Sequence, residues 1–155
     1  MLLMEYIFED FLFGFITEKW PALEVKGQSW DYLALHQNKN VFQIRNDLYL
    51  PGKLIIDAKY KTRASNDGLK AGVSQADMYQ MISYAITRNC PDVLLLYPAT
   101  ANGLNEPATF TVPSSMLSNA INILVRNLDI TFPDIAQADH LMIQRINALH
   151  AYFNN

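Results

Sequence analysis

A predicted β-hairpin over residues 45–61 constrains the fold of this chain more than any other segment. The sequence RNDLYLPGKLIIDAKYK contains two runs of strand-forming residues on either side of Pro51 and Gly52, which are a strong turn signal. The same segment carries two carboxylates and an ammonium group, on Asp47, Asp57 and Lys59. A sheet face that only packs has no use for such charges, so the hairpin is a candidate for chemistry as well as for structure.

The register of the hairpin decides whether the two aspartates meet. If the hairpin is centred on Gly52, Asp47 and Asp57 face each other, with their Cβ atoms about 4.5–5.5 Å apart, a separation at which like charges destabilise a sheet. Either one carboxyl group is then protonated or a cation lies between the two. Oxygen ligands favour Mg²⁺ or Mn²⁺. Lys59 points to the same side, in position to orient a metal-activated water or to stabilise charge on a phosphate.

An ordinary surface ion pair between Asp57 and Lys59 is the alternative, and the spacing alone does not separate the two interpretations. The helix predicted over residues 75–89 favours the first. Its expected core face consists of Met78, Tyr79, Ile82, Ala85 and Ile86. A second face carries Asp77, Gln80, Tyr84 and Arg88. Amide, phenol and guanidinium groups in a row suit contact with a sugar-phosphate backbone.

The composition indicates one globular domain over residues 1–155. Half of the residues are apolar and the net charge is −3, but the basic residues between positions 45 and 70 form a local cluster. The single cysteine, Cys90, excludes an intrachain disulfide and fits a cytoplasmic location. The apolar N-terminal segment lacks a basic start and is too short and too charged to span a bilayer, so no membrane partner is expected.

Periodicity and turn signals predict an α/β chain with a central mixed sheet flanked by helices. Ser74 is the expected N-cap of the middle helix. Residues 115–125 are the ambiguous stretch, since they are also compatible with a partly helical conformation. The predicted helices span 2–19, 75–89 and 134–153, and the predicted strands span 29–36, 41–50, 53–60, 93–97, 110–112 and 121–131.

Taken together, these motifs resemble a known group of nucleases. The pattern D-x(9)-D-A-K, followed by a helix with Q-x-x-x-Y, is similar to the QxxxY branch of the PD-(D/E)xK superfamily. The segments FEDF, DLYLPGKLIIDAKYK and DMYQMISYA more closely resemble the McrC family, the nuclease subunits of modified-cytosine restriction systems. The resemblance covers about residues 9–85 and implies a restriction-endonuclease-like core.

The resemblance also implies an activity and a set of site residues. The activity is hydrolysis of DNA phosphodiester bonds by an endonuclease that depends on Mg²⁺ or Mn²⁺. The implied catalytic residues are Asp47, Asp57, Lys59 and Gln80. The implied metal ligands are Glu9, Asp47, Asp57 and the backbone carbonyl of Ala58, with Glu5 as the alternative helix carboxylate. The implied DNA contacts are Lys61, Arg63 and Tyr84.

Two departures from the family pattern concern the first aspartate and the motor partner. Asn46 stands where the superfamily has a proline, which is not a ligand. McrC-like proteins usually carry an additional N-terminal region that docks on a GTP-driven AAA+ motor subunit, whereas this chain begins almost at the nuclease region. A natural short form, a fragment and a remnant are all compatible with that start. The chain has no G-x(4)-G-K-[ST] loop of its own.

Other functions remain open at this point. The phenylalanine-rich first helix is compatible with a non-catalytic interaction subunit that retains the nuclease fold, although burial of this helix between the sheet and the C-terminal helix is the simpler interpretation. A nuclease that acts on branched or single-stranded DNA is a third possibility, but the sequence shows no clear aromatic platform for it. A homodimer is also left open.

Overall fold

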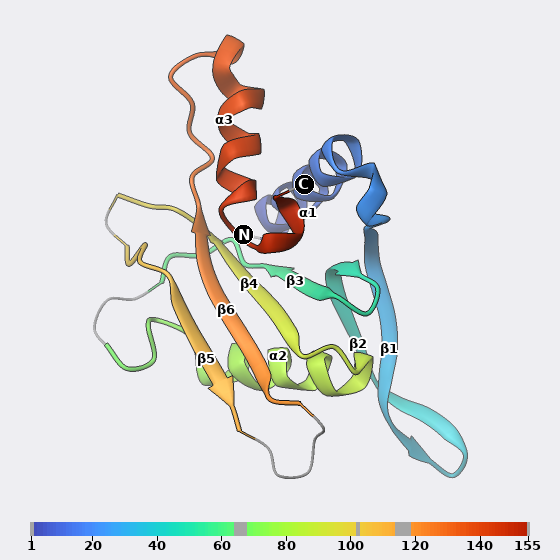
Figure 1. The fold of residues 1–155 in the computed structure, drawn as a ribbon. Helices are drawn as coiled ribbons and strands as arrows, with labels where there is room; N and C mark the ends of the chain where they lie inside the picture. The colour runs from blue at the N-terminus through green and yellow to red at the C-terminus, as the bar shows by residue number, and fades with distance from the viewer. Residues whose placement is uncertain (1, 64–67, 102, 114–118, 155) are drawn as a thin grey trace.

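A six-stranded mixed sheet forms the centre of the chain, and helices pack on both of its faces (Figure 1). The computed structural model describes residues 2–63, 68–101, 103–113 and 119–154. Its elements, in chain order, are α1 (Leu2–Lys19), η1 (Pro21–Leu23), β1 (Lys26–His36), β2 (Lys39–Leu50), β3 (Leu54–Ala58), α2 (Gln75–Arg88), β4 (Asp92–Pro98), β5 (Ala108–Val112), β6 (Ile121–Leu128), α3 (Ile135–Asn147) and η2 (Ala151–Phe153). The strand order is β1-β2-β3-β4-β6-β5.

Strands β1, β2 and β3 form an antiparallel meander with two tight turns. The first turn consists of Gln37 and Asn38, whose φ angles of 49° and 62° are the positive values that a two-residue hairpin loop requires. In the second turn the Lys53 amide donates to the Leu50 carbonyl over 2.9 Å, and Gly52 has a φ of 71°, which favours glycine. The β1–β2 ribbon extends beyond the rest of the sheet (Figure 1).

The predicted register of the β2–β3 hairpin is confirmed. The pairs Leu50–Leu54, Tyr49–Ile55 and Leu48–Ile56 are all centred on Gly52. The ladder ends at Leu48–Ile56, and just beyond it Asp47 contacts the neighbouring strand, because the Ala58 amide donates to Asp47 Oδ2 over 2.8 Å. Strand β3 then pairs in parallel with β4, and all five of its residues are buried. The second aspartate of the predicted pair therefore stands on one of the most rigidly held strands of the sheet.

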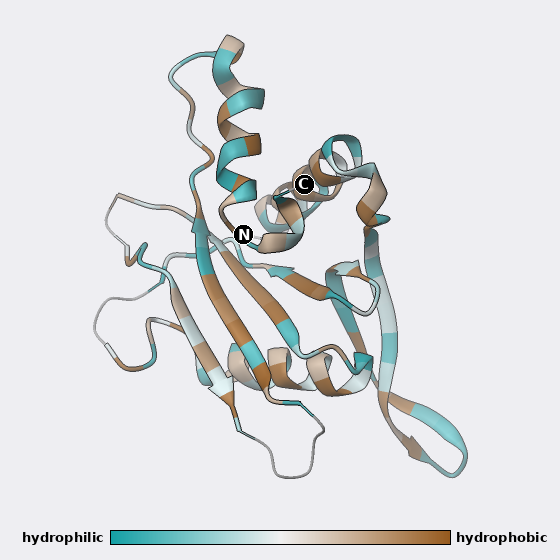
Figure 2. Ribbon diagram, in the orientation of Figure 1, coloured by the Kyte–Doolittle hydropathy of each residue, from teal (hydrophilic) through white to brown (hydrophobic). Residues whose placement is uncertain are grey.

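Each face of the sheet has its own apolar core, and the cores belong to different helices (Figures 1 and 2). On one face, α1, α3 and η2 cover Leu48, Ile56 and Leu94. On the other face, α2 covers Ile55 and Leu95 together with residues of β5 and β6. Strand β3 alternates regularly, with Ile55 facing α2 and Ile56 facing α1.

Strand β2 departs from regular alternation at its centre. Alternation over the predicted strand 41–50 puts the even-numbered Ile44 and Leu48 on one face, but Ile44 packs in the α2 core and Leu48 in the α1 core. The β1–β2 ladder is interrupted between these residues, where Gln28, opposite Asp47, has a positive φ of 35°. The pairs on either side of this gap keep the same register, so no residue is inserted, and the side chains of β2 change faces across a local irregularity of the ladder.

The buried stripe of α2 also differs from the prediction. Tyr79 and Ile86, expected in the core, are 61% and 54% exposed, whereas the helix buries Asp77, Met81, Tyr84 and Ala85. The helix is therefore rotated so that part of its predicted polar stripe faces the sheet. Ser74 caps it as predicted, because the Ser74 side chain accepts a hydrogen bond from the Asp77 amide.

The ends of several elements differ from the sequence prediction. Strand β1 begins at Lys26 rather than 29, and α3 ends at Asn147, with the separate turn η2 beyond it. Of the ambiguous stretch 115–125, residues 121–125 are strand and 115–118 lie outside the described residues. Helix α1 buries Phe8, Leu12 and Ile16 but leaves other apolar side chains exposed, so the expected burial holds for one side of the helix only.

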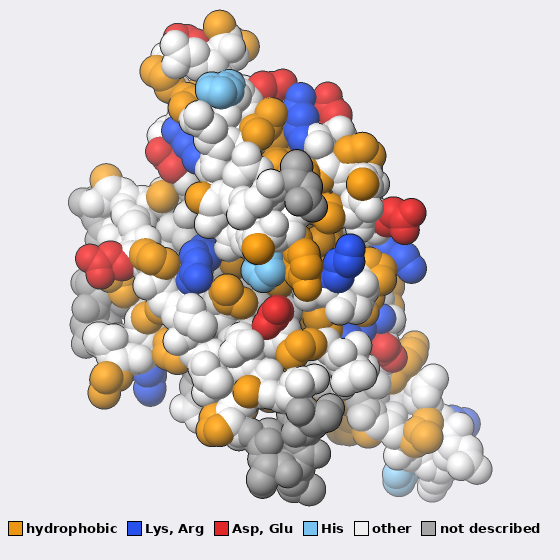
Figure 3. Space-filling model, in the orientation of Figure 1, with side chains coloured by type: hydrophobic (Ala, Val, Ile, Leu, Met, Phe, Trp, Pro, Cys, Tyr) orange, Lys and Arg blue, Asp and Glu red, His pale blue; other side chains and the backbone are white. Residues whose placement is uncertain are grey.

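The described surface mixes charge signs. On the face shown in Figure 3, basic and acidic side chains are interspersed with apolar ones, without a broad area of one sign among the described residues. None of the described helices combines the length and the apolar character that a bilayer-spanning segment needs.

Candidate active site

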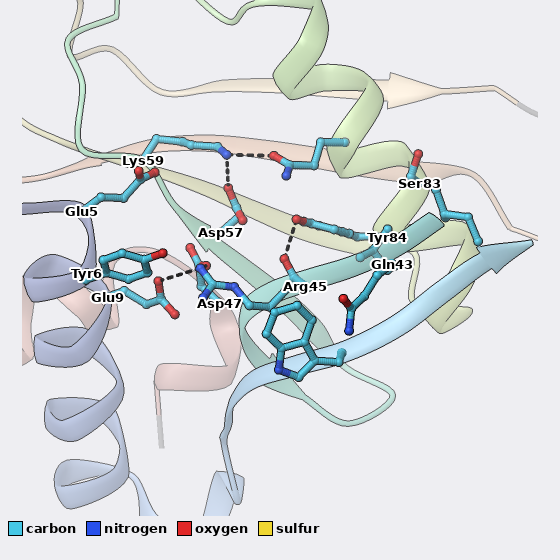
Figure 4. Close-up of a pocket in the computed structure, with 14 residues that line it drawn as sticks. Glu5, Tyr6, Glu9, Gln43, Arg45, Asp47, Asp57, Lys59, Ser83 and Tyr84 are labelled. Atoms are coloured by element: carbon cyan, nitrogen blue, oxygen red, sulfur yellow. Dashed lines mark hydrogen bonds and ion pairs between the residues drawn. The ribbon is translucent and has the colours of Figure 1, made fainter. Parts of the chain in front are cut away.

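A pocket of about 530 Å³ lies where α1, the ends of β2 and β3, and α2 meet (Figure 4). Helix α1 and the twisted β1–β2 ribbon form one side, and α2 forms the other. Its lining residues are Glu5, Tyr6, Glu9, Trp30, Leu33, Gln43, Ile44, Arg45, Asp47, Asp57, Lys59, Gln80, Ser83 and Tyr84. Most of the site residues expected from the sequence are therefore in one place.

Three buried carboxylates form the centre of this pocket. Glu9 comes from α1, where its neighbour Phe8 packs into the core. Asp47 comes from β2, and its Oδ2 accepts a hydrogen bond of 2.8 Å from the backbone amide of Ala58. Asp57 comes from the end of β3. Three elements with separate packing constraints thus bring their acidic groups into one pocket.

Lys59 lies beside Asp57 and is held by α2. Its Nζ is 3.0 Å from Asp57 Oδ2 and donates to Gln80 Oε1 over 2.8 Å. Burial disfavours the charged form of Lys59, but the carboxylates of Asp57 and Asp77 outweigh burial and raise the pKa of the amine above its usual value. The exposed Lys61 ion-pairs with Asp77 at 2.6 Å. Helix α2 therefore positions both lysines of the D-x-K-x-K segment.

Arg45 is the central cation of the pocket. Its Nη2 lies 3.6 Å from Glu9 Oε2 and 3.8 Å from Asp47 Oδ1. The guanidinium carbon lies 5.5 Å from the ring centroid of Tyr6 and 5.7 Å from that of Trp30. The Tyr84 hydroxyl donates to the backbone carbonyl of Arg45, which ties α2 to this strand (Figure 4). The position of Arg45 is thus defined from several sides.

The carboxylate oxygens test whether the site fits a divalent cation. Glu9 Oε1 is buried without a partner among the described residues, Glu9 Oε2 has only the Arg45 guanidinium at 3.6 Å, and Asp57 Oδ2 has only the ion pair with Lys59. Unsatisfied buried acceptors are costly, and hard oxygen donors are the ligands of Mg²⁺ and Mn²⁺. In the described part of the chain, no three Asp, Glu, His or Cys side chains stand close enough to chelate an ion as they are. Arg45 and Lys59 supply the positive charge at these carboxylates instead.

Burial and mutual repulsion change the acidity of the two aspartates. Burial, then the nearby Asp57 and Glu9 carboxylates, raise the pKa of Asp47 to about 8. Burial raises the pKa of Asp57 to about 6, against the opposing effect of Lys59. The effect of the Asp57 carboxylate on the pKa of Asp47 is what the opposed-aspartate register leads us to expect.

Not every predicted site residue reaches the pocket. Arg63 is only 1% exposed, and its guanidinium donates to the backbone carbonyls of Ala71 and Glu106 and to the Asn127 side chain. Since it has no surface to offer a phosphate in this arrangement, we leave it out of the proposed DNA contacts. Tyr84 is buried and lines the pocket wall, so its observed contact is with β2.

Sequence reasoning did not single out Tyr6, Trp30 or the role of Arg45. Tyr6 and Trp30 lie on α1 and β1, and neither belongs to a recognisable motif. Arg45 is one of the basic residues between positions 45 and 70, and no motif distinguishes it from the others. The spacing of Tyr6 from Glu9, less than one helical turn, is the signal that would have placed it near the carboxylates.

A buried acidic centre on a mixed sheet, with a lysine beside the second aspartate and a helix behind it, defines the class of a restriction-endonuclease-like fold. The chain belongs to the family described as McrBC 5-methylcytosine restriction system components, whose model matches residues 1–98. This membership agrees with the resemblance to the McrC family that the motifs predicted. No curated protein matches the sequence.

The fold is similar to that of a chain in a solved assembly from Thermococcus gammatolerans. That structure is a half-complex of a tetradecameric assembly of McrB AAA+ hexamers with bound McrC. The match has a TM-score of 0.58 at 16% sequence identity, and it covers 95% of the present chain. It covers 33% of the other chain, so the present chain spans about a third of the length of that relative. The likeness confirms the predicted fold class.

Replacing Asp47 by Asn is expected to stabilise the metal-free fold at alkaline pH. The pKa of this acid is about 8 in the folded chain and 3.8 in the reference state, so the unfolded chain releases the proton first as the pH rises. The free energy of unfolding therefore falls between about pH 4 and pH 8, and Asp47→Asn removes that contribution. We expect a gain on the order of 1–2 kcal/mol at pH 8 and almost none at pH 4.

The measurement is a thermal melt in EDTA at several pH values. Asp139→Asn is the matched control, because its carboxylate is exposed and pairs with Lys19 on the surface. An equal change in melting temperature in the two variants, or a gain that does not grow with pH, would show that ionisation of Asp47 does not destabilise the fold.

Proposed function

We propose that this chain is a metal-dependent endonuclease that hydrolyses DNA phosphodiester bonds within a McrBC-type restriction system. The observation that carries the proposal is the convergence of Glu9, Asp47 and Asp57 beside the Lys59–Gln80 pair in one pocket. Family membership supports the restriction-system context.

The proposed metal is Mg²⁺ or Mn²⁺. Glu9, Asp47 and Asp57 would hold it, with the backbone carbonyl of Ala58 as a further donor, since these are hard oxygen ligands and the buried Glu9 Oε1 lacks a partner among the described residues. When bound, such an ion activates a water molecule and offsets negative charge on a phosphate. Burial is the main cause of the raised pKa of Asp47. A bound divalent cation would lower this pKa, because its charge stabilises the ionised carboxylate.

The chain's own residues have separate proposed roles. Lys59 presents its ammonium group next to Asp57, where it can donate to an attacking water or to a phosphate oxygen. Gln80 fixes the direction of that amine through its Oε1. Tyr84 holds β2 in place, and the exposed Lys61 is the proposed contact to the DNA backbone.

Replacing Lys59 by Ala is expected to lower the cleavage rate by about 100- to 1,000-fold, the usual effect of removing one transition-state donor. The assay is conversion of supercoiled plasmid to nicked and linear forms with Mg²⁺ or Mn²⁺. Lys53→Ala is the control, because Lys53 is exposed on the hairpin turn and does not line the pocket. Cleavage that persists in Lys59→Ala, or in the presence of chelator, would refute the assignment.

Replacing Arg45 by Gln is expected to tighten Mn²⁺ binding about ten-fold, because a guanidinium that pairs with Glu9 and Asp47 competes with an added cation. Isothermal titration calorimetry measures this without any turnover. Arg145→Gln is the control and should not change the affinity, because it removes an ion pair between α3 and Asp129, which follows β6 and does not line the pocket.

The same titration separates the nuclease from its main alternative, a non-catalytic subunit that retains the fold. A chain that binds no Mn²⁺ in either the native or the Arg45→Gln form would favour that alternative. The exposed apolar side chains of α1 are the observation that supports it, and they include Leu3, Ile7 and Phe11.

We also propose that an AAA+ motor is the partner of this chain, as the McrB hexamers are for McrC in the Thermococcus gammatolerans assembly. The expected result is co-elution with a McrB-type protein in size-exclusion chromatography with light scattering. Lys59→Ala should co-elute equally well, since its side chain lies inside the pocket. Separate elution under all nucleotide conditions would contradict the partnership but not the nuclease activity.

A further inference from the structure

We propose that Tyr6 and Trp30 form a binding site for an unpaired nucleobase of the DNA strand that lies in the pocket. The inference rests on the proposed function and deepens it, because it names the substrate class as DNA with an unstacked base near the cleaved phosphate. We call the two rings the aromatic wall.

The aromatic wall lies in the same pocket as the carboxylates. Tyr6 projects from α1 and Trp30 from β1, and both line the cavity that contains Asp47, Asp57 and Lys59. Their rings contact the guanidinium group of Arg45, at 5.5 and 5.7 Å from their centroids. A strand whose phosphate lies beside Lys59 would thus have a neighbouring base within the same cavity as these rings.

The exposure of the two rings requires an explanation. Trp30 is 56% exposed and Tyr6 is 43% exposed, although the chain has two apolar cores that could receive aromatic side chains. Large aromatic side chains that remain open beside a polar site are typical of surfaces on which bases stack, since every base offers a π-face. The competing explanation is that the two rings serve only to position Arg45. That role does not require the rings to be exposed to solvent.

The polar neighbours of the wall suit a base. Gln43 and Ser83 line the same cavity and can exchange hydrogen bonds with the edge of a ring, while Leu33 adds an apolar contact. A volume of about 530 Å³ lies within the range that accommodates a small organic ligand and is much too small for a duplex segment.

A paired base cannot use the wall. In a duplex both faces of each base are covered by its neighbours in the stack, so a protein ring reaches a base face only at an end, in a single strand or at an extruded nucleotide. The wall therefore favours an unpaired base over a fully paired one. The sequence showed no clear aromatic platform for a nuclease that acts on branched or single-stranded DNA. In the fold, Tyr6 of α1 and Trp30 of β1 lie beside Arg45 and supply two such rings.

Tryptophan fluorescence tests the stacking directly. The chain has two tryptophans, and Trp20 is buried with its indole N–H bonded to the Phe153 carbonyl, so it supplies a constant background. The titration uses the Lys59→Ala chain with Mg²⁺, so that bound DNA stays intact. The three probes are a duplex with a single-stranded overhang, the same duplex with abasic sites in the overhang, and a fully paired duplex.

The expected result is quenching by the overhang duplex and little or none by the abasic or fully paired probes. Fluorescence anisotropy of labelled DNA measures binding separately. DNA binding without base-dependent quenching would overturn the aromatic wall and leave the nuclease proposal intact. Base-dependent quenching in a protein whose native form never cuts DNA would support the wall and overturn the nuclease proposal. Absence of any DNA binding would overturn both.

Variants assign the effect to the ring. Trp30→Ala is expected to weaken binding of the overhang duplex roughly ten-fold, and Trp30→Phe to restore most of the affinity while removing the fluorescence signal. Phe42→Ala is the matched control, because Phe42 is an exposed aromatic residue on the same ribbon that does not line the pocket. Equal losses in Trp30→Ala and Phe42→Ala, or no loss in Trp30→Ala, would refute the proposal.

Discussion

The structure depends on keeping three acidic side chains close together inside a folded chain. Glu9, Asp47 and Asp57 repel one another and have lost most of their hydration, and each alone would prefer to move to the surface. They stay because their backbones belong to elements that cannot move independently: a core-packed helix, a hairpin strand and a fully buried parallel strand. Arg45 and Lys59 offset part of the repulsion. The apolar packing of the two cores therefore offsets the cost of burying the acidic residues.

The two cores divide this work between them. The core under α1 and α3 fixes Glu9 and the inward side of the hairpin, while the core under α2 fixes Gln80 and Tyr84. The sheet between them is the common reference, because Asp57 extends from its middle. A shift of either helix layer would change the distances between the acidic groups and the lysine without any change in the strands.

Local signals predicted well what local forces decide. The Pro51–Gly52 turn set the register of the hairpin, and the Ser74 side chain set the start of α2. Lys59 and Gln80 are 21 positions apart, and their proximity was expected from the family motif, not from any local physical signal. The predictions that were wrong concerned features that depend on tertiary contacts. The distortion opposite Asp47, the rotation of α2 and the burial of Arg63 arise from packing between elements, and neither alternation nor helical periodicity contains that information. The meeting of Tyr6 with Trp30 across Arg45 is of the same kind.

The attachment of α1 has a consequence for how the protein is made. Its last turn and the following residue are fastened to the other end of the chain: Lys19 pairs with Asp139, and the Trp20 indole donates to the carbonyl of Phe153. Contacts between segments so far apart form late, after the intervening residues have been synthesised and ordered. On the ribosome, the emerging polypeptide thus carries its aspartates and lysine for some time before the glutamate is locked beside them. The acidic pocket therefore reaches its final arrangement only after α3 and η2 have packed against α1.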